Sequence, residues 1–234
     1  MKAILFLIGF GLLAISACKK GADCSGKSAL PKSINGFDAS FDSAGRLTEL
    51  YKFYPEVNFG PFQTASFTDI YAFNRTADSL TVQYKFDGQV VLSTVLKLDA
   101  QGRCVEKNGQ DRFFYSADGY LSEIIFQDNG IDTARLEYQD GNLFRYTDAK
   151  GSIAFEYANE PDTLPWSVQF LPLEYVLEWG IFLDCFGKPN KNRLIRYRVV
   201  STHNGTDKEY PVTYQYDPCE RLIRLGQYSF GYAD

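Results

Sequence analysis

Short runs of alternating polar and apolar residues, separated by tight turns, constrain the fold of this chain more than any other feature. The run Thr81–Phe86 alternates with period two and is followed by Asp87-Gly88 and a second run that ends at Leu98. Asp-Gly between two such runs predicts a β-hairpin, because a type I′ turn needs positive φ at both central residues. The same signal recurs at Asp118-Gly119 and Asp140-Gly141, with a longer version at Asp128-Asn129-Gly130.

The turns belong to a degenerate internal repeat. Each copy has an apolar or aromatic residue that ends one strand, a polar turn, and an apolar residue that starts the next strand. The copies are FDSAGRL (41–47), LDAQGRC (98–104), YSADGYL (115–121), YQDGNL (138–143) and YDPCERL (216–222). Their intervals are irregular, which indicates a meander of hairpins rather than a strict solenoid. The tyrosine–aspartate turns look like those of YD-repeat shells, although they are too few to build one.

The aromatic content supports extensive β-sheet. The chain has 19 Phe and 16 Tyr, which fit half-buried pleated surfaces. An aromatic-lined groove for sugar or lipid is the functional alternative. We expect an all-β, up-and-down antiparallel meander of about 10–14 strands, curled into a barrel or partial barrel because rolling the sheet removes exposed edges. One segment, 171–186, has helical spacing, so we expect at most one short helix, over residues 172–182.

The N-terminal segment predicts export. Lys2 precedes an apolar run, Ala3–Ala17, that is shorter than the roughly 20 residues of a membrane span. Ile15-Ser16-Ala17-Cys18 resembles the lipobox of bacterial lipoproteins, whose cysteine is acylated and becomes the N-terminus. The alternative is an ordinary signal peptide that ends near a cysteine. We predict a signal peptide over 1–17, lipidated Cys18 with a flexible tether over 18–33, and a single β domain over 34–234.

The C-terminal part carries a family resemblance. The segment Phe186–Asn192, FGKPNKN, is followed by a strand, a loop, Tyr214-Gln215-Tyr216-Asp217 and Arg221-Leu222. This pattern is similar to a family of uncharacterised Bacteroidota lipoproteins, a domain of unknown function with a porin-like fold. The chain departs from the pattern at Pro218-Cys219-Glu220. The resemblance implies a fold and an outer-membrane address, but no catalytic residues.

Two residues after the lipobox bear on orientation. Some lipoproteins of the Bacteroidota carry an acidic cluster there that directs them to the cell surface, but this chain has Lys19 and Lys20. We therefore expect the periplasmic face of the outer membrane rather than the cell surface.

Four further cysteines leave the disulfide pattern open. An exported chain lies where disulfides form, and four thiols allow three complete pairings. They are Cys24, Cys104, Cys185 and Cys219, and none has the spacing of a redox or zinc motif.

Candidate catalytic residues are few. The single histidine, His203, lies in a polar turn, and no nucleophile elbow accompanies it. Glu174 and Glu178, with Asp184 nearby, could serve a glycan hydrolase, or they could form a solvated helix face. The segment Asp128–Asp132 has oxygen ligands at a spacing that suits calcium, but the same pattern is also typical of a hairpin turn. We expect no cofactor and no metal site.

Four Asp-Ser or Asp-Thr steps before a small or aliphatic residue resemble the O-glycosylation acceptor of exported Bacteroidota proteins. Ordinary turn chemistry is the competing interpretation. The candidate acceptors are Ser43, Ser79, Thr133 and Thr163.

The net charge and the scarcity of catalytic residues bear on the expected function. The formal net charge of −5 argues against nucleic acid, which needs a basic stripe. We expect a non-catalytic, lipid-anchored envelope module that binds or scaffolds a glycan, a lipid or a protein. The rivals are a hydrolase that uses Glu174, Glu178 or Asp184, and a membrane-spanning barrel. Charged residues interrupt the strands that such a barrel would need. They are Lys85, Lys97, Arg135 and Glu137.

Overall fold

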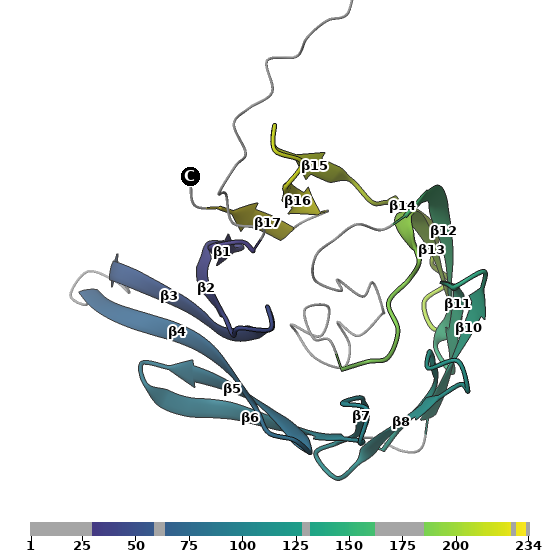
Figure 1. Ribbon diagram of the computed structural model, residues 1–234, viewed down its shortest axis with the longest axis horizontal. Helices are drawn as coiled ribbons and strands as arrows, with labels where there is room; N and C mark the ends of the chain where they lie inside the picture. Colours follow the sequence, from purple (N-terminus) through teal and green to yellow (C-terminus); the bar gives the residue numbers. More distant parts are fainter. Residues whose placement is uncertain (1–29, 59–63, 128–131, 162–184, 226–227, 233–234) are drawn as a thin grey trace, which may run out of the picture.

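The computed structural model describes residues 30–58, 64–127, 132–161, 185–225 and 228–232, and all regular structure in these ranges is β-strand (Figure 1). Within these ranges, seventeen strands form one antiparallel sheet. The first nine are β1 (Ser33–Ile34), β2 (Phe37–Phe41), β3 (Leu47–Asn58), β4 (Thr64–Arg75), β5 (Ser79–Phe86), β6 (Gln89–Leu98), β7 (Cys104–Lys107), β8 (Asp111–Tyr115) and β9 (Leu121–Phe126). The others are β10 (Asp132–Gln139), β11 (Asn142–Asp148), β12 (Gly151–Pro161), β13 (Asn192–Ser201), β14 (Asp207–Pro211), β15 (Tyr214–Tyr216), β16 (Leu222–Leu225) and β17 (Tyr228–Gly231). The helix predicted over 172–182 lies outside the described residues.

The strands follow one another round a ring in chain order. Each strand from β1 to β13 pairs with the one that follows it, and β16 pairs with both β15 and β17. β17 returns to pair with β1, where Ser33 lies opposite Gly231. No ladder among the described residues joins β14 to β15, so the sheet curls round but stays open at that seam. The predicted all-β antiparallel meander is confirmed as a partial barrel, with more strands than expected.

Type I′ turns form at two of the predicted Asp-Gly pairs. The φ angles are 47° at Asp87 and 78° at Gly88, and 53° at Asp140 and 85° at Gly141. Both central residues therefore have the positive φ that this turn requires. Asn35-Gly36 and Asn108-Gly109 are two further turns with the same pair of positive angles, beyond those predicted.

The prediction of a type I′ turn is wrong for Asp118-Gly119. Only Gly119 has positive φ there, at 87°. Ser116 closes a wider turn instead: its carbonyl accepts the Gly119 amide at 2.9 Å, and its Oγ accepts the Tyr120 amide at 3.2 Å. The predicted turn at Asp128-Asn129-Gly130 lies outside the described residues.

Three copies of the repeat share one hydrogen-bonded turn around an aspartate. In one copy, Asp99 Oδ1 accepts the amides of Gln101 and Arg103, both at 2.9 Å, and Asp99 Oδ2 accepts Arg103 Nε at 2.8 Å. Asp42 with Arg46, and Asp217 with Arg221, repeat these bonds. Each copy lies beside a register shift in its hairpin, so the repeat encodes a bulged turn of fixed shape.

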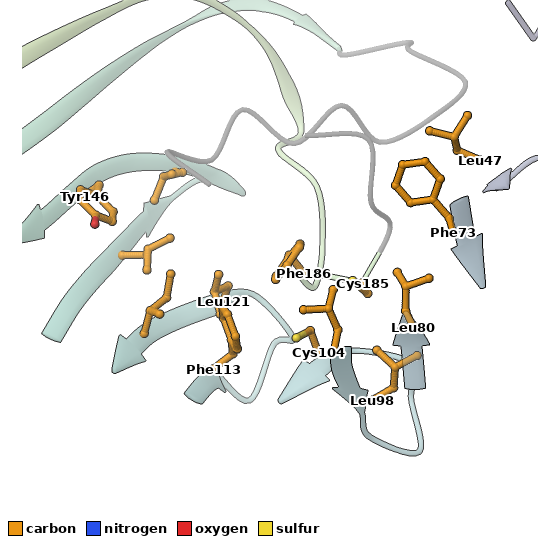
Figure 2. Packing of buried hydrophobic residues seen from close by; sticks show 14 of the residues in the cluster. Leu47, Phe73, Leu80, Leu98, Cys104, Phe113, Leu121, Tyr146, Cys185 and Phe186 are labelled. Atoms are coloured by element: carbon orange, nitrogen blue, oxygen red, sulfur yellow. The ribbon is translucent and has the colours of Figure 1, made fainter. Parts of the chain in front are cut away.

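The core lies on the inner side of the ring. Buried and exposed residues alternate along the strands, as in β10, where Ala134 and Leu136 are buried while Arg135 and Glu137 are exposed. The buried side chains form one apolar cluster drawn from strands all round the ring. Figure 2 shows part of this cluster, with Phe113 and Leu121 beside Phe186. The inner face is therefore lined by apolar side chains that pack against one another.

A chain segment inside the ring completes the core. Residues 185–191 lead into β13 and run within the ring (Figure 1). Cys185 and Phe186 are fully buried, and the Phe186 ring lies 5.4 Å from that of Phe113. Backbone bonds join Lys188 N to Gly119 O and Lys191 N to Gly141 O, each at 3.0 Å. The FGKPNKN segment therefore attaches to the turns of two hairpins.

Candidate functional site

The projecting ends of β3–β6 carry a row of aromatic side chains on the face that continues the core. These strands extend beyond the ring on one side (Figure 1). In the ladders, Leu50 lies opposite Tyr71, Lys52 opposite Asp69 and Tyr54 opposite Phe67. On the next strand, Tyr71 lies opposite Tyr84 and Asp69 opposite Phe86. We call Phe37, Lys52, Tyr54, Phe67, Asp69, Tyr71, Tyr84 and Phe86 the aromatic face.

The rings of the aromatic face contact one another across the strands. Tyr54 and Phe67 stack with centroids 4.5 Å apart, and Phe67 and Phe86 are 5.0 Å apart. Tyr71 stacks on Tyr84 at 4.9 Å, and Phe37 meets Tyr71 edge to face at 5.9 Å. Such cross-strand pairs stabilise the projecting strands. They also fix the positions of the ring edges and hydroxyls.

Two charged residues lie among the rings. Lys52 Nζ lies 5.4 Å from the Phe37 ring centroid and 4.8 Å from that of Tyr54. Asp69 accepts a hydrogen bond of 2.8 Å from the Tyr84 hydroxyl. This bond, with some desolvation, raises the pKa of Tyr84 to about 12. The aromatic face therefore offers one cation, one anion and a phenol that stays protonated at neutral pH.

Exposure increases along the aromatic face from the ring outwards. Leu50, Phe73 and Leu80 belong to the buried core, whereas Tyr54, Phe67 and Tyr84 on the same face are partly exposed. Phe86, at the end of β5, is 41% exposed. A surface of this kind can bind a ligand without any unfolding of the core.

The cysteines occupy two different environments. Cys104 and Cys185 are buried outside any disulfide (Figure 2). The Cys104 amide donates to the Cys185 carbonyl at 2.6 Å. Burial raises the pKa of the Cys104 thiol to about 12, which makes it unreactive in the folded protein. Cys219 takes part in a disulfide whose partner lies outside the described residues. Pairing of Cys219 with either buried cysteine is thereby excluded.

The O-glycosylation candidates within the described residues occupy different places. Ser43 is exposed in the turn that Asp42 organises. Ser79 is partly buried, and its hydroxyl lies 2.8 Å from Thr76 Oγ1. Thr133 is partly buried, with its amide bonded to Asp132 Oδ1 at 2.7 Å. Of these three residues only Ser43 is exposed, so it is the most accessible of the described candidates.

Several predicted site residues cannot be placed, because they lie outside the described residues. They are Cys18, Cys24, Thr163, Glu174, Glu178 and Asp184. His203 is described and is exposed in the loop between β13 and β14. Within the described ranges, no group of three or more His, Cys, Asp or Glu side chains is placed to hold a metal ion.

The sequence contained a signal for the aromatic face that composition alone does not give. Residues two apart on one strand share a face, so Lys52 and Tyr54 lie together, as do Phe67, Asp69 and Tyr71. Aligning β4 and β5 on their turn brings Tyr71 opposite Tyr84. The alignment of β3 with β4 could not be predicted in the same way, because their register shifts between Tyr54 and Val57.

The comparisons with known proteins identify the fold. No family model matches the sequence, and no curated protein matches it. Among solved structures, the chain is similar to the crystal structure of a porin-like protein from Bacteroides uniformis ATCC 8492, with a TM-score of 0.61 and 12% sequence identity. The match covers 84% of this chain and 89% of that one. In the part of this chain that the structure describes, no helix has the length and apolar character needed to cross a membrane. The fold is therefore porin-like.

Proposed function

We propose that this protein is a non-catalytic, lipid-anchored module of the bacterial outer envelope that binds a neutral glycan on the aromatic face. The observation that carries this proposal is the placement of Lys52 and Asp69 between stacked rings on a partly exposed sheet face. The envelope address rests on the lipobox at Cys18, and the porin-like fold agrees with it.

The mixture of groups on the aromatic face favours a glycan over a lipid. A ligand site usually combines apolar and aromatic walls with a few placed polar groups. Sugar hydroxyls both donate and accept hydrogen bonds, so they match the Lys52 ammonium and the Asp69 carboxylate together. A lipid acyl chain would leave both charges without hydration, and a phosphate headgroup would be repelled by Asp69.

The titration behaviour of Tyr84 favours binding over catalysis. A general acid or base works best when its pKa lies close to the working pH. The hydrogen bond to Asp69 raises the pKa of Tyr84 to about 12, far from neutral. Tyr84 is thus suited to hold a hydrogen bond, not to transfer a proton.

The exterior of the ring favours contact with water over contact with lipid. Arg196 forms ion pairs with Glu156 and Glu209, and Arg198 pairs with Asp207 at 2.6 Å, all on the exposed face of β12–β14. Charges on a lipid-facing strand cost about 2–4 kcal/mol each at the middle of a bilayer. We therefore favour an anchored module over the membrane-spanning alternative.

Retardation in native gels that contain soluble polysaccharides tests the proposed ligand class. Neutral glucans, mannans and xylans should slow the wild-type protein. Asp69→Asn and Phe86→Ala should lose most of this retardation. Phe53→Ala is the matched control, because Phe53 is 51% exposed on the opposite face of β3. Glycan binding on this face would be refuted if no polysaccharide slowed the wild-type protein, or if Phe53→Ala lost as much retardation as the two site variants. Binding to phospholipid vesicles, with no binding to any polysaccharide, would instead support a lipid site.

The absence of catalysis needs its own test. We expect no hydrolysis when the purified protein is incubated with envelope and dietary glycans. Turnover that disappears in Glu174→Gln or Glu178→Gln would replace the binding proposal with a hydrolase. Turnover that survives both changes would also contradict the non-catalytic role and would place the chemistry elsewhere.

A further inference from the structure

Among the described strands, none pairs with one edge of β6 over most of its length. β5 pairs with β6 from Gln89 to Lys97, but the ladder between β6 and β7 covers only Leu96–Leu98. Asn108 extends this contact by one residue: it donates to the Val95 carbonyl at 2.8 Å, and its Oδ1 accepts the Val95 amide at 2.7 Å. Residues 89–94 therefore form an open edge within the described part of the sheet.

The alternation of backbone hydrogen bonds along β6 shows which amides and carbonyls face this edge. The amide and carbonyl of Val95 point away from β5, because both bond to Asn108. Groups two residues apart on a strand point the same way, so the amide and carbonyl of Ser93 also face the open edge. A second strand could bond to Ser93 without disturbing any bond between β5 and β6.

The side chains along this edge are apolar and unusually exposed. Val90, Val91 and Leu92 are 52%, 62% and 61% exposed, and Val95 is 45% exposed. The stretch 89–96 holds no charged residue, no proline and no glycine. Natural proteins normally protect an edge with charge, proline or a covering segment. The edge of β3 differs from that of β6 in this respect, because the part of β3 beyond its last pair with β2 contains a proline, Pro55, and a charged residue, Glu56.

We propose that β6 is a docking edge at which two copies of this chain pair, with β6 of one copy antiparallel to β6 of the other. A two-fold antiparallel pairing places this segment opposite itself, so every contact is between uncharged residues and no like charges meet. The β5–β6 hairpin projects from the ring (Figure 1), which leaves room for the second copy. Because each copy uses its one open β6 edge, assembly stops at two.

Sedimentation equilibrium of the full chain in a Cys18→Ser background, which removes the acyl anchor, tests the proposal. The wild-type edge should give a monomer–dimer equilibrium. Ser93→Pro removes the outward amide and no β5–β6 bond, and Val91→Lys places like charges across the two-fold axis. Each should weaken dimerisation by at least about tenfold. Ile223→Lys is the control, because Ile223 is 37% exposed on β16, distant along the sheet.

A second measurement locates the contact. A photo-crosslinking amino acid at position 91 should capture residues 89–98 of another copy. Circular dichroism identifies any variant that fails to fold, and the crosslink on the otherwise unchanged chain does not depend on such variants. A monomer at all concentrations, a dimer unaffected by both edge variants, or a crosslink to any other segment would each overturn the proposal.

Discussion

Arg103 places its guanidinium over the ring of Tyr115, with the carbon Cζ 4.5 Å from the ring centroid. The Tyr115 hydroxyl in turn donates to the carbonyl of Cys104 at 2.7 Å. The last hairpins repeat this arrangement: Arg221 lies 4.6 Å from the Tyr232 ring centroid, and Tyr232 donates to the Leu222 carbonyl at 3.0 Å. The tyrosine of each unit thus holds the end of a turn through a carbonyl that lies eleven residues earlier for Tyr115 and ten residues earlier for Tyr232.

Removal of the Tyr115 hydroxyl should destabilise the protein more than removal of the Tyr232 hydroxyl. Tyr115 also bonds to the Cys185 carbonyl at 3.3 Å, so Tyr115→Phe removes hydrogen bonds to two buried carbonyls, of which the Cys185 carbonyl keeps its bond from the Cys104 amide. We expect a loss of about 1–3 kcal/mol in the free energy of unfolding, measured with urea. Tyr210→Phe is the control, because no hydrogen bond to its hydroxyl is found among the described residues. Equal effects of all three changes would show that the hydroxyl contacts are unimportant.

The Asp–Arg turns should make stability fall in acid. Burial by itself would raise the pKa of Asp99, but hydrogen bonds from the Arg103 amide and guanidinium outweigh it and hold that pKa below its usual value. The pKa of Asp217 is lowered in the same way by Arg221. The unfolded chain then binds protons more readily. The Asp–Arg turns therefore contribute their full stabilisation above the aspartate pKa of the unfolded chain, about 3.9. This stabilisation is lost as the pH falls through the lower aspartate pKa of the folded protein.

Asp99→Asn isolates this contribution. The variant should be less stable than wild type at neutral pH, and the difference should shrink as pH falls towards 3, in urea titrations at several pH values. Asp87→Asn is the control, because asparagine also accepts the positive φ of a type I′ turn. A difference between Asp99→Asn and wild type that does not change with pH would contradict the assignment.

The hairpin turns were the most predictable part of the fold, because their chemistry is local. Asp87-Gly88 specifies its turn from two residues, whereas Asp118-Gly119 does not, since Ser116 supplies a competing side-chain acceptor. The return of β17 to β1 and the seam between β14 and β15 depend on contacts far apart in sequence. The aromatic face requires the register of β3 against β4, which no local pattern gives.

A reciprocal exchange tests the conformation of the repeated turn. Glu220 has φ of 60°, whereas the equivalent positions in the other two aspartate turns are Gly45 and Gly102. Side chains cost about 1–2 kcal/mol in this left-handed region. Glu220→Gly should therefore raise the melting temperature, and Gly102→Glu should lower it, although a Cβ at Gly102 meets nothing within 4 Å. If calorimetry instead shows that Glu220→Gly lowers the melting temperature and Gly102→Glu raises it, side-chain contacts rather than φ decide which residue is favoured at these positions.

The anchor can be tested independently of the fold. Cys18→Ser should leave the protein unacylated and move it from the membrane fraction to the soluble fraction, because stable attachment requires more than one acyl chain. Radiolabelled palmitate should enter the wild type only. If the serine variant stays with membranes through carbonate extraction, the lipoprotein assignment is wrong.

Gly187 should tolerate no side chain, because the inner segment lies directly on the barrel wall there. A Cβ at Gly187 would lie 2.7 Å from the Gly119 carbonyl oxygen and 2.9 Å from the Tyr115 ring. Gly205 is the matched control: its φ of 67° resembles the 84° of Gly187, but a Cβ there meets nothing within 4 Å. Both alanine variants carry the backbone cost of about 1 kcal/mol, whereas only Gly187→Ala adds a clash. Gly187→Ala should therefore lose at least about 2 kcal/mol more in urea unfolding, and hydrogen exchange should increase at Lys188 and Lys191. Equal losses in the two variants would show that the FGKPNKN segment does not depend on its close approach to the wall.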